Sequence, residues 1–388
     1  MQNKQSFLLC MGTRPEIIKM APLYHELSRR GVRVSLLHTG QHKDLAQPMY
    51  DFFGMRPDYS LLINRTGNTL EHLSALLIER IGAILADITP RTVIVQGDTT
   101  TALMAALAAF YHKIPVAHVE AGLRTGNKYD PFPEEVNREL ISRIASWHFA
   151  PTPQAAKNLK REGIEESAIA VVGNTVVDAV VMAQQKMQEN ERAGLYGPFL
   201  SAASHEGKRV VLVTAHRREN WDGPMLSVAK AVRTLVKEFP DLLVVWPLHA
   251  NPVVRQTVIS VLGKLPKALE KQVMLVDSLS YPALLEVLSK SWMVLTDSGG
   301  LQEEAATLHV PVLVLRKTTE RQELIDVGAG KIVGTHHDDI VEEVEALWNN
   351  PVEYDSMKNA VNPFGDGTAA RQMADALLTR QSSKAKKP

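Results

Sequence analysis

The chain has 388 residues, more than one hydrophobic core usually covers, and 45% of them are hydrophobic, as in an ordinary globular protein. Its 43 Lys and Arg residues balance 43 Asp and Glu residues, so no overall charge attracts nucleic acid or an anionic membrane. The single cysteine, Cys10, excludes an intrachain disulfide and argues against a zinc cluster. Neither a long apolar span nor a signal-peptide pattern occurs, so we expect a cytoplasmic protein with no membrane segment.

Apolar runs that suit strands alternate with segments of helical periodicity along the chain. This alternation is typical of βα units around a parallel sheet. The first half contains six such runs, at 7–12, 32–38, 92–96, 115–119, 147–150 and 169–172. The second half contains six more, at 209–215, 242–247, 273–276, 292–296, 311–315 and 331–333. We therefore predict two doubly wound α/β domains that face each other across a cleft.

A segment rich in Gly, Pro and Ser separates the two sets of strands and predicts a domain boundary. We place the first domain at residues 1–180, a linker region at 181–207 and the second domain at 208–366. Turn signals then precede a helix expected at 367–380. The remaining residues, 381–388, are expected to form a disordered tail.

The first predicted strand ends in Gly12 and Thr13, and Pro15 follows at a favoured first helical position. Arg14 stands at the end of the strand and Lys19 lies one turn into the helix. Both cations are therefore expected at the sheet edge where α/β proteins bind ligands. Taken alone, Lys19 is more often a solvated surface lysine, whereas Arg14 is harder to explain without an anion.

Acidic residues fall at the same edge of the first domain: Asp98 after "VIVQG", Glu120 in "VAHVEAGLRTG", and Glu134 or Glu135 in "PFPEEVNREL". Asp98 could instead cap the next helix, and Glu134 could simply favour a helix N-terminus. A salt bridge to Arg124 is the alternative for Glu120. Grouped carboxylates shift one another's pKa values, so they can supply both a proton donor and a proton acceptor near neutral pH.

In the second domain a predicted strand leads through Ser298, Gly299 and Gly300 into a helix. The glycines allow a ligand to approach the backbone, and the free N–H groups of the helix favour a phosphate. Glu304, one turn later, is placed to accept hydrogen bonds from ribose hydroxyls. The alternative for Ser298 is that it only caps the helix.

Another strand of the second domain ends in His216, within "VVLVTAHRREN". An imidazole there can donate to a phosphate or act as an acid, although a structural role is the alternative for it and for His249. The segment "GAGKIVG", residues 328–334, resembles a dinucleotide fingerprint, but it precedes a strand, so we expect no NAD site. Phosphate-binding groups together with carboxylates indicate a nucleotide-linked substrate that undergoes proton transfer.

Nine motifs resemble, in order, those of the bacterial non-hydrolysing UDP-N-acetylglucosamine 2-epimerases. They are GTRPEIIKMAPL, QGDTTTALMAALAAFY, IPVAHVEAGLRTG, PFPEEVNRELISR, GNTVVDA, VTAHRREN, LTDSGGLQEEA, PVLVLRKTTER and NPFGDG. The resemblance implies a GT-B type fold, with two Rossmann-like doubly wound domains facing a central cleft and a C-terminal helix crossing back to the first domain. It also implies a homodimer that uses neither NAD nor metal.

The same resemblance implies roles for individual residues. Asp98, Glu120, Glu134 and His216 would be catalytic. Ser298, Gly299 and Gly300 would hold the diphosphate, and Glu304 the ribose. Further ligand-binding positions would be Arg14, Lys19, His216, Leu279, Leu284 and Arg321. A second, activating UDP-N-acetylglucosamine site would lie near Gln41 and His42.

The reaction implied by the resemblance interconverts UDP-N-acetylglucosamine and UDP-N-acetylmannosamine. UDP is expelled with loss of the carbon-2 proton, which gives 2-acetamidoglucal, and UDP adds back after protonation on the other face. Which acid performs which step does not follow from the sequence. The alternatives are a 2-epimerase of another UDP-2-acetamido sugar, a GT-B glycosyltransferase, and a sensor that binds a UDP-sugar without turning it over.

Overall fold

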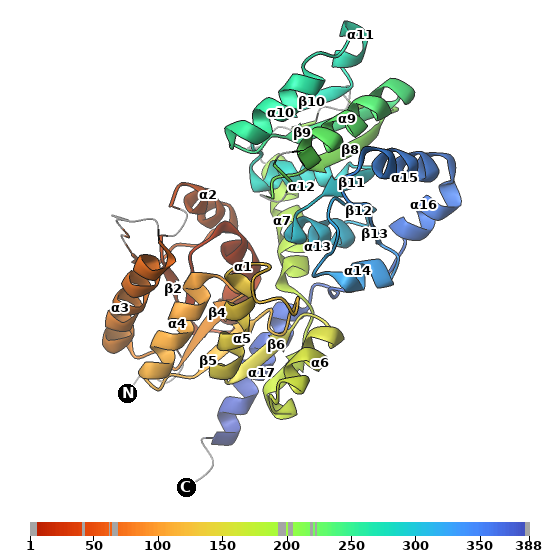
Figure 1. The fold of residues 1–388 in the computed structure, drawn as a ribbon. Helices are drawn as coiled ribbons and strands as arrows, with labels where there is room; N and C mark the ends of the chain where they lie inside the picture. Colours follow the sequence, from red (N-terminus) through yellow and green to blue (C-terminus); the bar gives the residue numbers. More distant parts are fainter. Residues whose placement is uncertain are drawn as a thin grey trace. The chain divides into compact units, whose positions relative to one another are not determined.

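The computed structural model describes residues 6–40, 43–61, 63, 69–192, 199–200, 205–217, 220–221 and 223–384. The chain divides into two compact units. The first consists of Met1–Met182 and Phe364–Pro388, and the second of Ala183–Pro363. In each unit helices cover a parallel β-sheet (Figure 1). The predicted fold class, two Rossmann-like parallel α/β domains, is confirmed.

The sheet of the first unit has the strand order β3-β2-β1-β4-β5-β6-β7, and its described pairings are all parallel. Its strands are β1 (Ser6–Met11), β2 (Arg33–His38), β3 (Tyr59–Ser60), β4 (Thr92–Gln96), β5 (Val116–Val119), β6 (Trp147–Ala150) and β7 (Ile169–Val171). The six predicted strands are present. Strand β3 was not predicted, because two residues are too few to show a period.

Helices α3, α4 and α5 pack side by side on one face of this sheet. Leu8 and Cys10 of β1 point into the core beneath them, together with Val93 and Val95 of β4. Alternate residues of each strand face this core, because successive side chains of a β-strand point to opposite faces of the sheet; the residues between them are buried on the other face. The helices of the unit are α1 (Arg14–Arg29), α2 (Lys43–Phe53), α3 (Leu70–Ile88), α4 (Thr100–Tyr111), α5 (Glu134–Ile144), α6 (Pro153–Arg161), the short 3₁₀ helix η1 (Glu166–Ala168) and the start of α7 (Thr175–Arg192).

The second unit has the strand order β10-β9-β8-β11-β12-β13. Its strands are β8 (Arg209–Thr214), β9 (Leu242–Pro247), β10 (Val273–Val276), β11 (Met293–Thr296), β12 (Val312–Val314) and β13 (Gly330–Ile332). Its helices are α9 (Gly223–Glu238), α10 (Pro252–Leu262), α11 (Lys267–Glu270), α12 (Tyr281–Ser289), α13 (Gly299–Thr307), α14 (Gln322–Asp326), α15 (His337–Asn349) and α16 (Pro351–Lys358). The segment 328–334, which was expected to precede a strand, contains β13, and only its first two residues lie before that strand.

The C-terminal segment returns to the first unit, where helix α17 (Ala369–Lys384) packs against α1. The backbone N–H of Asn174 donates to the carbonyl of Phe364 at 2.7 Å, which fixes the point of return. The helix continues to Lys384, beyond the end expected at residue 380, so residues 381–384 belong to it and not to a tail. The expected linker region, 181–207, begins inside α7, which continues to Arg192.

Across the part of the chain that the structure describes, no helix combines the length and apolar character needed to cross a membrane.

Asp178 of α7 holds the beginning of α17. Its carboxylate accepts hydrogen bonds from the backbone N–H groups of Ala369 at 3.3 Å and Ala370 at 2.9 Å. Burial raises the pKa of the Asp178 carboxyl from 3.8 to about 6, against the opposing effect of these two donors, and the charge of Asp366 adds to the rise. The folded state therefore binds the Asp178 proton more tightly than the unfolded state does.

We expect Asp178→Asn to change the pH dependence of stability. A raised carboxyl pKa means that the wild type loses folding free energy as pH rises from about 4 to 6. The free energy of unfolding of the wild type should fall relative to that of Asp178→Asn by about 1.4 kcal/mol between pH 5 and pH 7.5. Urea unfolding at several pH values measures this difference. The exposed Asp241→Asn is the control, and an equal slope in both variants would contradict the assignment.

Candidate active site

Glu120 directly follows β5 and forms a buried ion pair with Lys19 of α1. The Nζ of Lys19 donates to both carboxylate oxygens, at 2.8 and 2.9 Å, and the two residues are 7% and 8% exposed. Gln96 Nε2 donates to the same carboxylate, and so does Asn174 Nδ2 at 3.3 Å. Glu120 also has a φ of 65°, a left-handed conformation that a non-glycine residue keeps only where its surroundings enforce it. The structure thus joins two predicted site residues that are far apart in sequence.

Two structural alternatives for these residues are wrong. Lys19 is buried, so it is not a solvated surface lysine. Arg124 does not take Glu120 as its partner, because its Nε donates to Glu162 at 2.7 Å.

Asp98 lies in the loop between β4 and α4, and its Oδ2 accepts from Arg138 NH2 of α5 at 2.6 Å. Asn137 Nδ2 donates to the carbonyl of Asp98 at 2.8 Å. Asp98 does not cap α4, because Thr99 is the N-cap and accepts from the N–H of Ala102 at 3.0 Å. The Asp98 side chain, 28% exposed, is therefore held toward the beginning of α5.

The two acids at the start of α5 have different surroundings. Glu135 is fully buried, and its Oε1 accepts from the N–H groups of Thr125 and Gly126, both at 2.9 Å. Its other oxygen lies 3.3 Å from Arg138 NH1. Glu134 is the first residue of the helix and is only half-buried. Glu135 therefore organises the preceding loop, which leaves Glu134 as the better candidate for chemistry.

His118 on β5 supports the loop that carries Asp98. Burial lowers the pKa of His118 to about 3, so the ring is neutral near pH 7. Its Nε2 lies 2.8 Å from the carbonyl of Gly97, which can only accept, so Nε2 donates. Gly97 has a φ of 69°, which favours glycine at this turn.

In the second unit, the buried Asp297 at the end of β11 organises the loop after β8. Its Oδ2 accepts from the N–H groups of His216 at 2.8 Å and Arg217 at 2.9 Å, and from Asn220 Nδ2 at 2.9 Å. The His216 Nδ1 lies 3.3 Å from Asp297 Oδ1, and its ring stacks on that of His249 with centroids 5.7 Å apart. The side chain of His216 is 44% exposed. Asp297 and His249 thus orient the imidazole ring of His216, and part of the ring stays accessible to solvent.

The loop from β11 to α13 places Ser298, Gly299 and Gly300 at the helix N-terminus, as predicted. Within the described chain, the Ser298 side chain does not cap α13, so the alternative of a purely capping serine is not realised. The guanidinium of Arg321 lies across Gly299, where an added Cβ would come within 2.9 Å of it. A guanidinium beside a helix N-terminus places two groups that attract anions next to each other. Arg321 Nε also donates to Glu303 at 3.0 Å, which fixes its orientation.

Further cations surround this N-terminus. Glu320 is their shared partner: Arg316 NH1 donates to it at 2.8 Å, and Arg321 and Arg217 lie at 3.7 and 3.9 Å. Although burial opposes the change, these three guanidinium groups lower the pKa of Glu320 to about 2. Glu320 therefore holds three guanidinium groups together, and Glu303 pairs with one of them, Arg321.

The other predicted ligand positions are distributed as follows. Glu304 is buried in α13, and Arg14 is half-buried at the start of α1. Leu279 and Leu284 are half-buried, before and within α12. Gln41 and His42, predicted near a second site, lie outside the described residues.

Three residues that organise the loops of the candidate site were not predicted: Arg138, Glu16 and Asp297. Arg138 lies one helical turn after Glu134, and that i, i+4 spacing is a signal that could have placed both on one face of α5. Asp297 follows β11 as Asp98 follows β4, so its place after an apolar strand is a signal that could have identified it. Glu16 had the capping-box spacing from Thr13, which predicts a helix start but no wider role.

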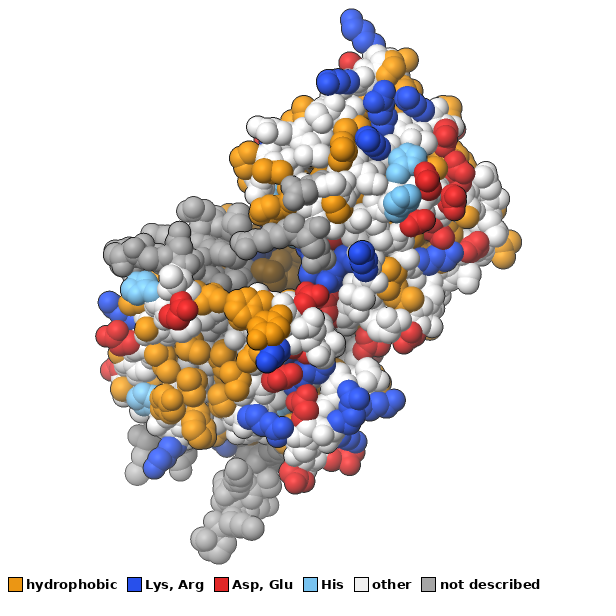
Figure 2. Space-filling model, viewed as in Figure 1, with side chains coloured by type: hydrophobic (Ala, Val, Ile, Leu, Met, Phe, Trp, Pro, Cys, Tyr) orange, Lys and Arg blue, Asp and Glu red, His pale blue; other side chains and the backbone are white. Residues whose placement is uncertain are grey.

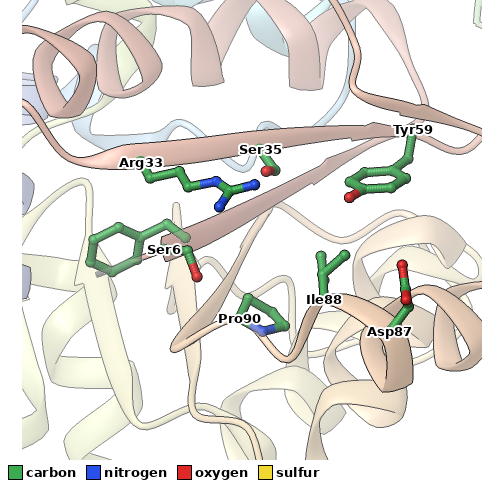
Figure 3. Close-up of a pocket in the computed structure, with 8 residues that line it drawn as sticks. Ser6, Arg33, Ser35, Tyr59, Asp87, Ile88 and Pro90 are labelled. Carbon is green, nitrogen blue, oxygen red and sulfur yellow. The ribbon is translucent and has the colours of Figure 1, made fainter. Parts of the chain in front are cut away.

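A separate cavity of about 260 Å³ lies in the first unit, lined by Ser6, Arg33, Ser35, Tyr59 and Asp87 among others (Figure 3). Ser6 and Arg33 begin β1 and β2, so this cavity is at the amino edge of those strands. Ligands of open α/β sheets bind at the carboxyl edge, where the predicted residues lie. We therefore do not assign the reaction to this cavity.

The described residues hold no group of three or more His, Cys, Asp or Glu side chains arranged to bind a metal. The fold, with ion-paired carboxylates at the ends of its strands, is that of an α/β enzyme.

Comparisons with known proteins identify the family. The family model for UDP-N-acetylglucosamine 2-epimerase matches residues 25–378. The UDP-N-acetylglucosamine 2-epimerase of Escherichia coli K12 is 41% identical over 97% of this chain and 99% of its own length. The enzyme of the same name from Bacillus subtilis is 42% identical over 100% of this chain and 98% of its own.

A solved structure agrees with these relatives. The UDP-GlcNAc 2-epimerase of Neisseria meningitidis, bound to UDP-GlcNAc, superposes with a TM-score of 0.88 at 39% identity, covering 96% of this chain and 100% of the other. The protein therefore belongs to the UDP-N-acetylglucosamine 2-epimerase family.

We expect Lys19→Met to destabilise the first unit by about 3–5 kcal/mol, because it leaves the charge of Glu120 buried without its cation. The double variant Lys19→Met/Glu120→Gln removes both charges and should recover most of this loss. Urea unfolding of the wild type, the two single variants and the double variant measures the coupling. Additive effects of the two substitutions would contradict the pairing.

Proposed function

We propose that the protein interconverts UDP-N-acetylglucosamine and UDP-N-acetylmannosamine by inverting carbon 2 of the sugar. The observation that carries this proposal is the pair of carboxylates at the ends of β4 and β5, each held by a cation. Asp98 is held by Arg138 and Glu120 by Lys19. Membership of the family supplies the substrate class.

The chemistry of the sugar requires an elimination. Carbon 2 carries an acetamido group and has no neighbouring carbonyl, so loss of its proton alone gives no stabilised anion. In our proposal the bond from carbon 1 to the UDP oxygen breaks, and its electron pair leaves with UDP. The carbon-2 proton passes to a carboxylate, and a carbon 1–carbon 2 double bond forms. Protonation of carbon 2 from the other face and return of UDP to carbon 1 complete the inversion.

We assign the proton transfers to Asp98, Glu120 and Glu134. Arg138 and Lys19 hold the carboxylates of Asp98 and Glu120 in place beside the ends of two neighbouring strands, where both could exchange protons with a bound sugar. The hydrogen bonds that orient these groups in advance reduce the reorganisation needed during the reaction.

We assign the diphosphate to the N-terminus of α13. The backbone at Ser298 to Gly300, the cation of Arg321 and the imidazole of His216 would stabilise the charge that develops on departing UDP. We assign the ribose to Glu304 and the further ligand contacts to Arg14, Leu279 and Leu284.

Proton NMR of the purified protein with UDP-N-acetylglucosamine in D₂O, without added NAD, metal or acceptor, tests the function. We expect UDP-N-acetylmannosamine to appear with deuterium at carbon 2, because the proton removed exchanges with solvent before another returns. Glu120→Gln is expected to slow both inversion and exchange at least a hundredfold, by analogy with the loss of an acid–base group. A wild-type protein that leaves carbon 2 protonated and the substrate unchanged would contradict the proposal. Cleavage that depends on an acceptor would indicate a glycosyltransferase instead.

We also propose that the protein forms a homodimer through the outer face of α3, α4 and α5. The twelve residues of α4 include no charged side chain. Phe110 and Tyr111 at its end are 58% and 66% exposed, and Leu140 of α5 is 47% exposed. Figure 2 shows the apolar side chains gathered on this face.

A second copy of the chain fits this face. In a two-fold dimer the same surface meets itself, so an uncharged centre avoids opposing like charges. The neighbouring helices carry both signs, with Glu79 and Arg80 exposed on α3 and Glu139 and Arg143 on α5. The formal net charge of zero adds no general repulsion between copies.

We expect the double variant Phe110→Glu/Tyr111→Glu to be monomeric. Light scattering should give a mass near 42.9 kDa for this variant and twice that value for the wild type. Val352→Glu changes a residue that is 80% exposed in the second unit and serves as the control, which should stay dimeric. A monomeric wild type, or a dimeric double variant, would contradict the proposed interface.

A further inference from the structure

Glu16 is a buried carboxylate in the first turn of α1 and is only 1% exposed. Its Oε2 accepts from the N–H groups of Gly12 at 2.9 Å and Thr13 at 2.7 Å, and from the Thr13 hydroxyl at 2.8 Å. Its Oε1 accepts from the hydroxyl of Thr99 at 2.6 Å. One side chain therefore receives four hydrogen bonds.

These bonds go further than the capping of α1 requires. In a capping box the acid at the third helical position accepts from the N-cap backbone. Glu16 and Thr13 form such a box at the start of α1. The bond from Thr99, 83 residues away in sequence, has no part in that motif. Thr99 is itself the N-cap of α4, so Glu16 connects the beginnings of two helices.

The two connected loops carry predicted active-site residues. Arg14 lies between Thr13 and Glu16, and Asp98 directly precedes Thr99. The strands before these loops, β1 and β4, are neighbours in the sheet, so the loops lie side by side at its carboxyl edge. A bond between the loops therefore fixes the backbone of Arg14 relative to that of Asp98.

Burial raises the pKa of the Glu16 carboxyl, and the bonds from Thr99, Gly12 and Thr13 oppose that rise. An aliphatic side chain would fill the same space without a desolvation cost. What it could not do is gather donors from two loops. The hydrogen bonds that a carboxylate accepts at this position explain why the residue is an acid; the volume of the side chain does not.

We propose that Glu16 is a positioning residue for the reaction, which holds the loop of Arg14 and the loop of Asp98 in the arrangement that proton transfer needs. The inference rests on the proposed epimerase function and adds to it a residue that would act through the two loops that it joins.

The surroundings of Asp98 indicate what loss of this link would change. Arg138 and Asn137 still hold Asp98 from α5, so the loop would keep one of its two attachments. The loop that carries Asp98 would then keep its conformation but shift relative to Arg14. A shift of this kind slows a proton transfer more than it weakens binding of the nucleotide, since small misplacements of catalytic groups act on the rate.

The experiment compares Thr99→Val, Thr99→Ser and Thr152→Val by steady-state epimerisation of UDP-N-acetylglucosamine and by thermal unfolding. Valine keeps the shape of Thr99 but removes its bond to Glu16, and serine restores the hydroxyl. Thr152 is the matched control: it caps α6, accepts from the N–H of Ala155 at 3.1 Å, and follows β6, which β4 and β5 separate from β1. Thr152→Val therefore reports the cost of losing a helix cap away from the loops of Arg14 and Asp98.

We expect Thr99→Val to lower kcat at least tenfold with less than a threefold change in KM. Thr99→Ser should recover at least half of the wild-type kcat. Thr152→Val should lower the unfolding temperature about as much as Thr99→Val does. Its kcat should nevertheless stay within twofold of the wild-type value. If Thr99→Val fails to fold, the less bulky Thr99→Ala takes its place in the same comparison.

Two results would overturn the inference while the wild type epimerises its substrate. One is an unchanged kcat in Thr99→Val, and the other is an equal loss of kcat in Thr152→Val, which would indicate a structural role only. A wild-type protein without epimerase activity would instead refute the proposed function.

Discussion

Buried carboxylates at the carboxyl ends of parallel strands are the constraint on which the rest of this structure depends. A parallel sheet brings the ends of all its strands to one edge. A charge placed there out of water is costly unless hydrogen bonds or a counter-charge compensate it. Glu120 and Asp297 each lie at such an end and are at most 8% exposed. Their need for donors determines how the neighbouring loops are arranged.

The two units meet this need in different ways. In the first, Glu120 takes a cation, Lys19, and amide donors from Gln96 and Asn174. In the second, Asp297 takes backbone N–H groups and an asparagine amide, and orients His216 as a result. The ion pair leaves a titratable group in place for proton transfer. The backbone donors instead produce a fixed loop beside the N-terminus of α13, which suits the binding of an anion.

The strands and helices could be predicted because apolar periodicity is a local property. Every described strand but β3 was predicted, and β3 has only two residues. Part of the candidate site could be predicted for the same reason, because Asp98, Glu120 and His216 stand where apolar runs end. Arg138 and Glu16 were missed because each has an ordinary local explanation, one as a helical arginine and the other as part of a capping box. Their importance comes from Asp98 and Thr99, which are distant in sequence.

The sequence by itself determined the alternation of strands and helices, the order of the motifs, and the residue types available at each strand end. These follow from local burial and from turn chemistry, which nearby residues encode. Only the tertiary structure decided which partner each charge takes: Lys19 and not Arg124 for Glu120, Thr99 and not Asp98 as the cap of α4, and Glu135 and not Glu134 as the acid of the preceding loop. Partner choice depends on distances between loops of adjacent strands, and the topology of the sheet sets those distances.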